Sequence, residues 1–301
     1  MKKEVKADSL AIYIDRITRL KPNETENSLY SEELVFRGLS SRSYYLVPSI
    51  GRRPSRKWAN SMLTTERDLV SEAQTKFPDI FQNDDLPINK LAKLQHYGIP
   101  TRLLDVTTSA LVALFFACRK CSDSNLSQDG EVVVFSMRSL PALNSYANII
   151  ADTYRLIGDV RTPVERYYYK AIQQSYSISL KDPEWEQLDE LRIHSFMQNF
   201  TSPLLVEAFE SSLRQKNQQG KYILFPNTTS KVLDKDYIID ELVTLEKNDK
   251  SIIKRIIIPE GSKDKILQQL QLLGVKEEFL FADNIDTVFR NVKEHQEQRF
   301  S

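Results

Sequence analysis

The sequence has few of the residues on which the commonest nucleotide and metal sites depend. Of its 301 residues only eight are glycine, whereas an average composition would give about 21. Neither G-x-G-x-x-G nor G-x-x-x-x-G-K-[ST] occurs, so the two common glycine-rich phosphate loops are absent. The three histidines stand far apart, at positions 96, 194 and 295, and we therefore expect no bound metal. Any nucleotide must be held by other groups.

Cysteine pairs, net charge and long apolar runs are also lacking. Cys118 and Cys121 cannot build a disulfide framework, and a lone C-x-x-C lacks the second pair typical of zinc sites. Because 41 Lys+Arg balance 41 Asp+Glu, the chain is not expected to coat nucleic acid. The longest apolar run, Ala110–Cys118, is too short to cross a bilayer, and the charged first residues do not resemble a secretory signal. We expect a cytoplasmic protein with no membrane partner.

The hydrophobic periodicity predicts a mixed α+β fold. Helical spacing of apolar residues predicts helices over 7–20, 63–77, 90–97, 107–121, 184–212 (as two), 263–273 and 285–297. Short apolar runs predict strands over 34–36, 131–137, 221–226 and 252–258, with 101–105 as a loop or short strand. Since long helical insertions separate these strands, we expect a mixed central sheet rather than a doubly wound one. One domain is expected over 1–301, with core motifs at 34–137 and 214–284 and a helical insertion at about 140–212.

The densest group of polar side chains surrounds a turn at Gly98 and Pro100. The residues of interest are Gln95, His96, Thr101, Arg102, Asp105 and Thr107. A strongly apolar helix follows at once, and a polar turn fixed to a buried helix presents its side chains rigidly. We interpret this segment as a candidate site. The alternative is that His96 and Asp105 are ordinary turn and helix-cap residues.

Two shorter motifs are further candidates. In Phe36-Arg37-Gly38 an arginine follows an apolar strand, where its guanidinium can bind phosphate or carboxylate through two parallel hydrogen bonds. Gln218 and Gln219 precede the strand at 221–226, where their amides can bind a heterocycle or position a substrate. A solvated strand end and a solvated helix terminus are the alternatives for these two motifs.

Together these segments resemble the FRG domain family, named after its Phe-Arg-Gly motif and found in bacteria and phages. The resemblance is strongest over Gln95–Asp105 (QHYGIPTRLLD) and includes Val35–Gly38, Asn217–Gly220 and Leu273-Gly274. It also includes Phe281-Ala282-Asp283, where the family has Phe-Pro-Asp. It implies a single FRG domain over nearly the whole chain, and a toxin-like or phage-defence role.

The order of features is also distantly similar to that of the ADP-ribosyltransferases. This similarity implies an enzyme that uses NAD as its substrate, for ADP-ribosyl transfer or NAD hydrolysis, with a phage or host protein or a nucleic acid as acceptor. Arg37 would bind the pyrophosphate, and Thr101 and Thr107 would orient the ribose and nicotinamide. The implied catalytic residues are His96, Asp105 and Gln218, and the implied ligand-binding residues are Arg37, Gly38, Gln95, Thr101, Arg102, Thr107 and Gln219.

Two other functions stay open. Gln219-Gly220 stands where an acidic residue is expected in such an enzyme, which favours a non-catalytic module that binds a nucleotide or a nucleic acid. An RNA-processing enzyme with His96 as general base is a further alternative. A single site requires Arg37, His96, Thr101, Asp105 and Gln218 to converge. Arg102 has a second interpretation as a buried charge partner of Asp105.

Overall fold

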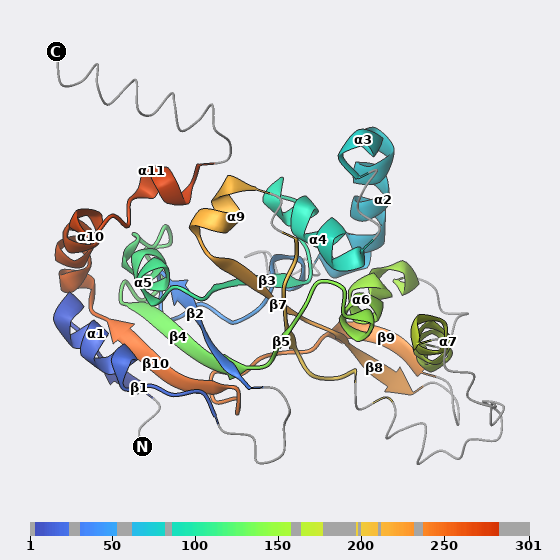
Figure 1. The fold of residues 1–301 in the computed structure, drawn as a ribbon, viewed down its shortest axis with the longest axis horizontal. Coiled ribbons are helices and arrows are strands. Elements are labelled where there is room, and N and C mark those ends of the chain that lie inside the picture. The colour runs from blue at the N-terminus through green and yellow to red at the C-terminus, as the bar shows by residue number, and fades with distance from the viewer. Residues whose placement is uncertain are drawn as a thin grey trace.

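The computed structural model describes residues 4–23, 31–52, 62–81, 86–157, 164–176, 197, 200–209, 212–231 and 237–282. Their centre is one eight-stranded sheet (Figure 1). In spatial order its strands are β1 (Glu4–Lys6), β10 (Ile252–Ile258), β4 (Gly130–Met137), β2 (Glu33–Leu39), β3 (Leu103–Thr107), β7 (Gly220–Leu224), β6 (Leu204–Val206) and β5 (Ser139–Leu140). The pairs β1–β10 and β5–β6 are parallel and the others antiparallel. The expected α+β fold with a mixed central sheet is confirmed.

Helices and a small second sheet complete the described part of the chain. The second sheet pairs β8 (Asn227–Lys231) with β9 (Tyr237–Leu242). The α-helices are α1 (Leu10–Thr18), α2 (Glu66–Lys76), α3 (Pro78–Phe81), α4 (Pro87–His96), α5 (Ala110–Cys118), α6 (Ser145–Ala151), α7 (Val164–Tyr176), α9 (Leu213–Asn217), α10 (Lys263–Leu272) and α11 (Glu277–Leu280). None of the helices in these residues is long and apolar enough to span a membrane.

The sheet is buried on both faces. Two groups of helices cover one face. Helices α1, α5 and α10 pack over β10, β4 and β2. On the same face, α4, α6 and α7 pack over β3, β6 and β7. The other face is covered by loop residues such as Leu46, Ile50 and Leu245. The side chains of the central strand β4 alternate between the two faces. Val132 and Val134 pack with α1, α5 and α10, whereas Val133 and Phe135 pack on the other face with Leu46, Ile50 and Leu245. All eight residues of β4 are buried.

Helix α5 lies unusually close to the sheet. A Cβ atom on Gly38 in β2 would stand 1.9 Å from the carbonyl oxygen of Ala113, and one on Gly130 in β4 would stand 2.0 Å from that of Ala117. Ala113 and Ala117 are one turn apart and share a face of α5, so small residues meet glycines along the contact. Gly38 of the Phe-Arg-Gly motif therefore allows the backbone of α5 to contact β2 directly.

Several predicted elements are found close to their expected positions. Helix α1 begins after Ser9, whose side chain accepts a hydrogen bond from the Ile12 amide, and β10 spans Ile252–Ile258 as expected. Strand β2 continues through Arg37 and Gly38, which the sequence placed at its end. The helix expected from Thr107 begins at Ala110 instead, because Thr107 is the last residue of β3 and Ser109 caps the helix.

Two helices are expected over 184–212, separated near Thr201-Ser202-Pro203, and the second of them is wrong at Leu204–Val206. These residues form β6, and Leu205 and Val206 are fully buried where β6 pairs with β7. A run of three apolar residues fits a buried helix turn as well as a buried strand, and only the neighbouring strand decides between them. Residues 184–196 and the helix expected at 285–297 lie outside the described residues.

The contact between Gly38 and α5 predicts a large loss of stability in Gly38→Ala. The added methyl group meets a helix carbonyl that no side-chain rotation can move, so α5 must shift. We expect the free energy of unfolding, measured by urea denaturation, to fall by about 3 kcal/mol. Gly261→Ala is the matched control, because a Cβ there meets nothing within 4 Å. Equal stability of the two variants would contradict the close packing.

Candidate functional site

The candidate site lies where the sheet opens between β2 and β3. These neighbouring strands pair at one position only, Phe36 with Thr107. Beyond that pair Nη1 of Arg37 crosses the gap and donates a hydrogen bond to the backbone carbonyl of Asp105. The guanidinium thus stands where a backbone N–H of β2 would continue an antiparallel ladder. The opening leaves space that side chains of α4, α5 and α9 enclose.

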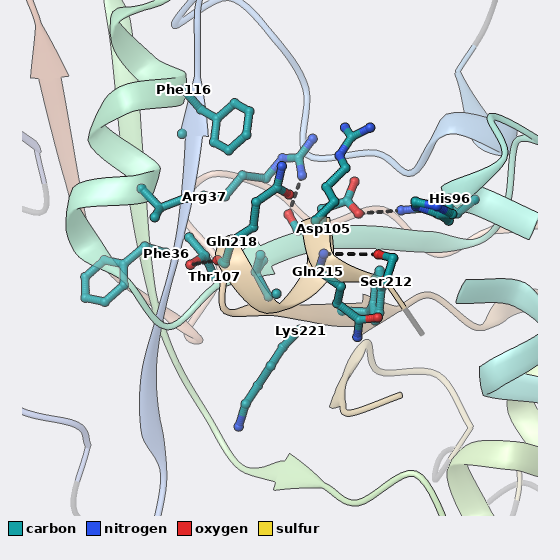
Figure 2. Close-up of a pocket in the computed structure, with 17 residues that line it drawn as sticks. Phe36, Arg37, His96, Asp105, Thr107, Phe116, Ser212, Gln215, Gln218 and Lys221 are labelled. Atoms are coloured by element: carbon teal, nitrogen blue, oxygen red, sulfur yellow. Dashed lines mark hydrogen bonds between the residues drawn. The ribbon is translucent and has the colours of Figure 1, made fainter. Parts of the chain in front are cut away.

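A pocket of about 240 Å³ occupies this opening. It is lined by seven of the residues expected in the site, namely Arg37, Gly38, Gln95, His96, Asp105, Thr107 and Gln218. Figure 2 shows Asp105 between Arg37 and His96, with Phe116 above them. The structure therefore brings together three motifs that are far apart in the sequence. Thr101, Arg102 and Gln219 do not line the pocket.

The Asp105 side chain is exposed in the pocket and is held by a short chain of hydrogen bonds. The Leu103 amide donates to Thr101 Oγ1 at 3.2 Å, and the Thr101 hydroxyl donates to Gln95 Oε1. Gln95 Nε2 then donates to Asp105 Oδ1 at 2.6 Å. Thr101, which is 1% exposed, thus acts on the site through Gln95. The conformation of the Gln95–Asp105 segment fixes one carboxylate oxygen while the side chain stays accessible.

Arg37 supplies positive charge beside this carboxylate. Burial lowers the pKa of Arg37 to about 10, with Asp105 acting to raise it and the like charge of Arg52 acting to lower it. The guanidinium is therefore charged at neutral pH. Its Nε atom is buried and has no hydrogen-bond partner. Arg37 lines the pocket, and a charged guanidinium there is a suitable contact for an anionic ligand group.

Thr107 and Gln218 connect the walls of the pocket. Thr107 Oγ1 donates to the Gln218 carbonyl at 2.6 Å and accepts from the Ser109 amide at 2.9 Å. The Gln218 side chain donates to the Leu280 carbonyl at 2.8 Å. Both side chains therefore join β3, α5, α9 and the end of α11. Gln219 has a positive φ of 46° and lies at the turn into β7, where its carbonyl accepts from the Thr108 amide.

Arg102 lies away from the pocket, and its partner is Glu66. It is fully buried, donates to both Glu66 carboxylate oxygens at 3.0 and 2.6 Å, and donates to Asn227 at 2.8 Å. Burial acts to lower the pKa of Arg102, but the Glu66 carboxylate outweighs burial and the net shift is upward. The expected pairing with Asp105 is wrong, because the Arg102 guanidinium binds Glu66 and Asn227 whereas the Asp105 carboxylate accepts from Gln95.

Two pocket residues, Phe116 and Arg214, carried no clear sequence signal. They pack with Phe281, which does not line the pocket, in a group in which Arg119 and Arg214 stand 4.9 and 5.1 Å from the Phe281 ring. The Phe116 and Phe281 rings are 5.9 Å apart. Phe281 is part of the Phe-Ala-Asp motif, which was the one available signal. Burial and the Asp105 charge raise the pKa of Tyr222, another lining residue, so its phenol is neutral.

Other acidic residues and the cysteines do not contribute to the pocket. Glu207 forms an ion pair with Lys221 at 2.8 Å, and that lysine lowers the pKa of the carboxyl. Burial raises the pKa of the Cys118 thiol to about 12, so it is an unreactive core residue. The described ranges contain no group of three or more His, Cys, Asp or Glu side chains that could hold a metal ion.

Comparison with known families gives one match. Residues 32–126 match the family model described as the FRG domain. This segment contains the Phe-Arg-Gly motif and Gln95–Asp105, so the resemblance is confirmed there. Comparison with curated proteins and with solved structures gives no match.

Arg102→Met is predicted to affect stability strongly. Removing the guanidinium leaves the Glu66 carboxylate buried without its partner, which costs about 3–5 kcal/mol. We expect this loss in urea denaturation, whereas Arg16→Met, on the exposed side of α1, should change stability by less than about 0.5 kcal/mol. The double variant Arg102→Met with Glu66→Met should recover much of the loss. A single variant as stable as the control would contradict the buried pair.

Proposed function

We propose that this pocket binds NAD or a related nucleotide and that the protein cleaves the bond between ribosyl C1′ and the nicotinamide nitrogen. The observation that carries the proposal is the exposed Asp105 carboxylate, fixed by Gln95 and placed next to the Arg37 guanidinium. This arrangement offers a negative group and a positive group within one small pocket. A nucleotide with a glycosidic bond near its phosphates has the complementary charges.

Cleavage of the glycosidic bond uses both the Asp105 carboxylate and the Arg37 guanidinium. When the glycosidic bond breaks, its electron pair leaves with nicotinamide and positive charge develops at C1′ and the ring oxygen. A carboxylate held near this centre stabilises the developing charge, as it does in other reactions with oxocarbenium-like transition states. We assign this role to Asp105. The attacking water or acceptor hydroxyl then forms the new bond to C1′ and loses its proton to a base, for which His96 and Asp105 are the candidates in the pocket.

The remaining residues bind and position in this proposal. Arg37 lines the pocket and donates to a phosphate oxygen through its guanidinium, of which one Nη already binds the Asp105 carbonyl. Gln95 and Thr101 are positioning residues for Asp105. The hydroxyl of Thr107 already serves a backbone carbonyl and a backbone amide, so Thr107 shapes the pocket wall.

A module that binds nucleotide without turnover is the second candidate. One observation favours it: the pocket has no second carboxylate among its described lining residues, because Gln218 is an amide and Glu207, which is paired with Lys221, does not belong to the lining. Asp105 is the only acidic side chain among the lining residues that the structure describes, and the experiment below separates binding from turnover.

The decisive variant is Asp105→Asn, which keeps the shape of the side chain and removes its charge. We expect the wild-type protein to release nicotinamide from labelled NAD, and the variant to lose about a hundredfold or more of that rate. NAD affinity measured by calorimetry should stay close to that of the wild type, because Arg37 is unchanged.

The matched control is Asp264→Asn, which removes an exposed carboxylate from the first turn of α10. It should leave nicotinamide release unchanged. NAD binding without any nicotinamide release by the wild type would favour the non-catalytic module. If the wild-type protein neither binds NAD nor releases nicotinamide from it, the proposed use of NAD is refuted.

A further inference from the structure

A second cavity adjoins the first and is about three times larger. Its volume is about 730 Å³, against about 240 Å³ for the pocket with Asp105. Arg37, Gly38 and Phe116 line both cavities, so the two spaces meet at the Phe-Arg-Gly motif. Sites for drug-sized ligands occupy roughly 300–1,000 Å³. The smaller pocket falls below that range and the larger cavity falls within it.

Cationic side chains predominate in the larger cavity. Arg52, Arg119 and Lys120 line it together with Arg37, and Glu241 is the one acidic lining residue that the structure describes. Lys120 is exposed and makes no hydrogen bond or ion pair with the described residues. Arg52 uses its Nε for the Val47 carbonyl at 3.1 Å, and its terminal nitrogens make no hydrogen bond with the described residues. Several donors thus face one space that has little negative charge of its own.

Aromatic side chains lie beside these cations. Tyr44 and Tyr45 both line the cavity, and Tyr45 is 83% exposed, more than any other large aromatic side chain among the described residues. A side chain this exposed contributes little to the core. A nucleobase can stack on such a ring, and base–aromatic stacking contributes about 1–3 kcal/mol. The larger cavity therefore combines phosphate donors with a surface for a base.

We infer that the larger cavity binds the adenosine diphosphate half of the dinucleotide, with its phosphates at Arg37, Arg52 and Lys120 and its base at Tyr45. The inference rests on the proposed function for the identity of the whole ligand. A dinucleotide exceeds the smaller pocket, so its second half must continue into adjoining space. Arg37 stands at the junction, where the phosphates that join the two halves would lie.

An extended single-stranded nucleic acid fits these features less well. Such ligands require a basic groove that follows several successive phosphates. Here the cations surround one cavity, and the chain as a whole carries no net charge. The observations therefore favour a compact nucleotide.

Two probes test the two cavities separately. ADP represents the half assigned to the larger cavity, and nicotinamide mononucleotide represents the half assigned to the pocket with Asp105. We expect ADP to bind by calorimetry, with Arg52→Gln and Lys120→Gln each weakening its affinity about five- to tenfold. Tyr45→Ser should weaken ADP binding by a similar factor. Cleavage of nicotinamide mononucleotide should be lost in Asp105→Asn, since Asp105 lines only the smaller pocket, while the ADP affinity of that variant stays close to that of the wild type.

Lys265→Gln is the matched control, since Lys265 is an exposed lysine on α10 and lines neither cavity. ADP binding that depends on Arg52, Lys120 and Tyr45 supports the inference even where no nicotinamide is released, and then only the proposed reaction fails. Cleavage of nicotinamide mononucleotide without ADP binding, or ADP binding that the three variants leave unchanged, overturns the inference. Binding of a six-nucleotide single strand in place of ADP also overturns it.

Discussion

The close approach of helix α5 to strands β2 and β4 is the constraint on which the candidate site depends. Gly38 and Gly130 allow the carbonyls of Ala113 and Ala117 to lie where side chains would otherwise stand. This contact brings Val112 and Phe116 of α5 over the opening between β2 and β3, where they form one wall of the pocket. A larger residue at either glycine would move that wall outward. The packing of the core thus sets the width of the site.

The opening in the sheet has its own physical cost, and Arg37 offsets it. Strands β2 and β3 pair at a single position, so backbone groups beyond that pair lack a ladder partner. The Arg37 guanidinium satisfies the Asp105 carbonyl, and Arg37 lines both the pocket and the larger cavity. One side chain therefore closes the edge of a strand and presents charge to both cavities. This double use explains why an arginine, with several donors on one rigid group, suits the position.

The sequence predicted individual helices, strands and turns better than it predicted strand pairing and side-chain contacts between distant segments. Alternating and helical apolar patterns located β10, α1 and the polar turn at Gly98 because those signals depend on neighbouring residues alone. Strand β6 and the partner of Arg102 were missed because both depend on contacts across the fold, namely pairing with β7 and the carboxylate of Glu66. The sequence context of Gly38 indicates only that a small residue is needed, and the structure shows that α5 approaches β2 there while Gly38 also lines the pocket.

The segment Thr101–Asp105 illustrates how one short motif can carry stability and chemistry together. Arg102 enters the interior and binds Glu66, a residue that the chain places before α4, whereas Asp105 faces the pocket and binds Gln95. The buried pair fixes the backbone immediately before the strand that carries the exposed carboxylate. In the proposed reaction the carboxylate needs such a rigid support, because small displacements weaken electrostatic stabilisation. Arg102 thus supports the position of Asp105 without lining the pocket itself.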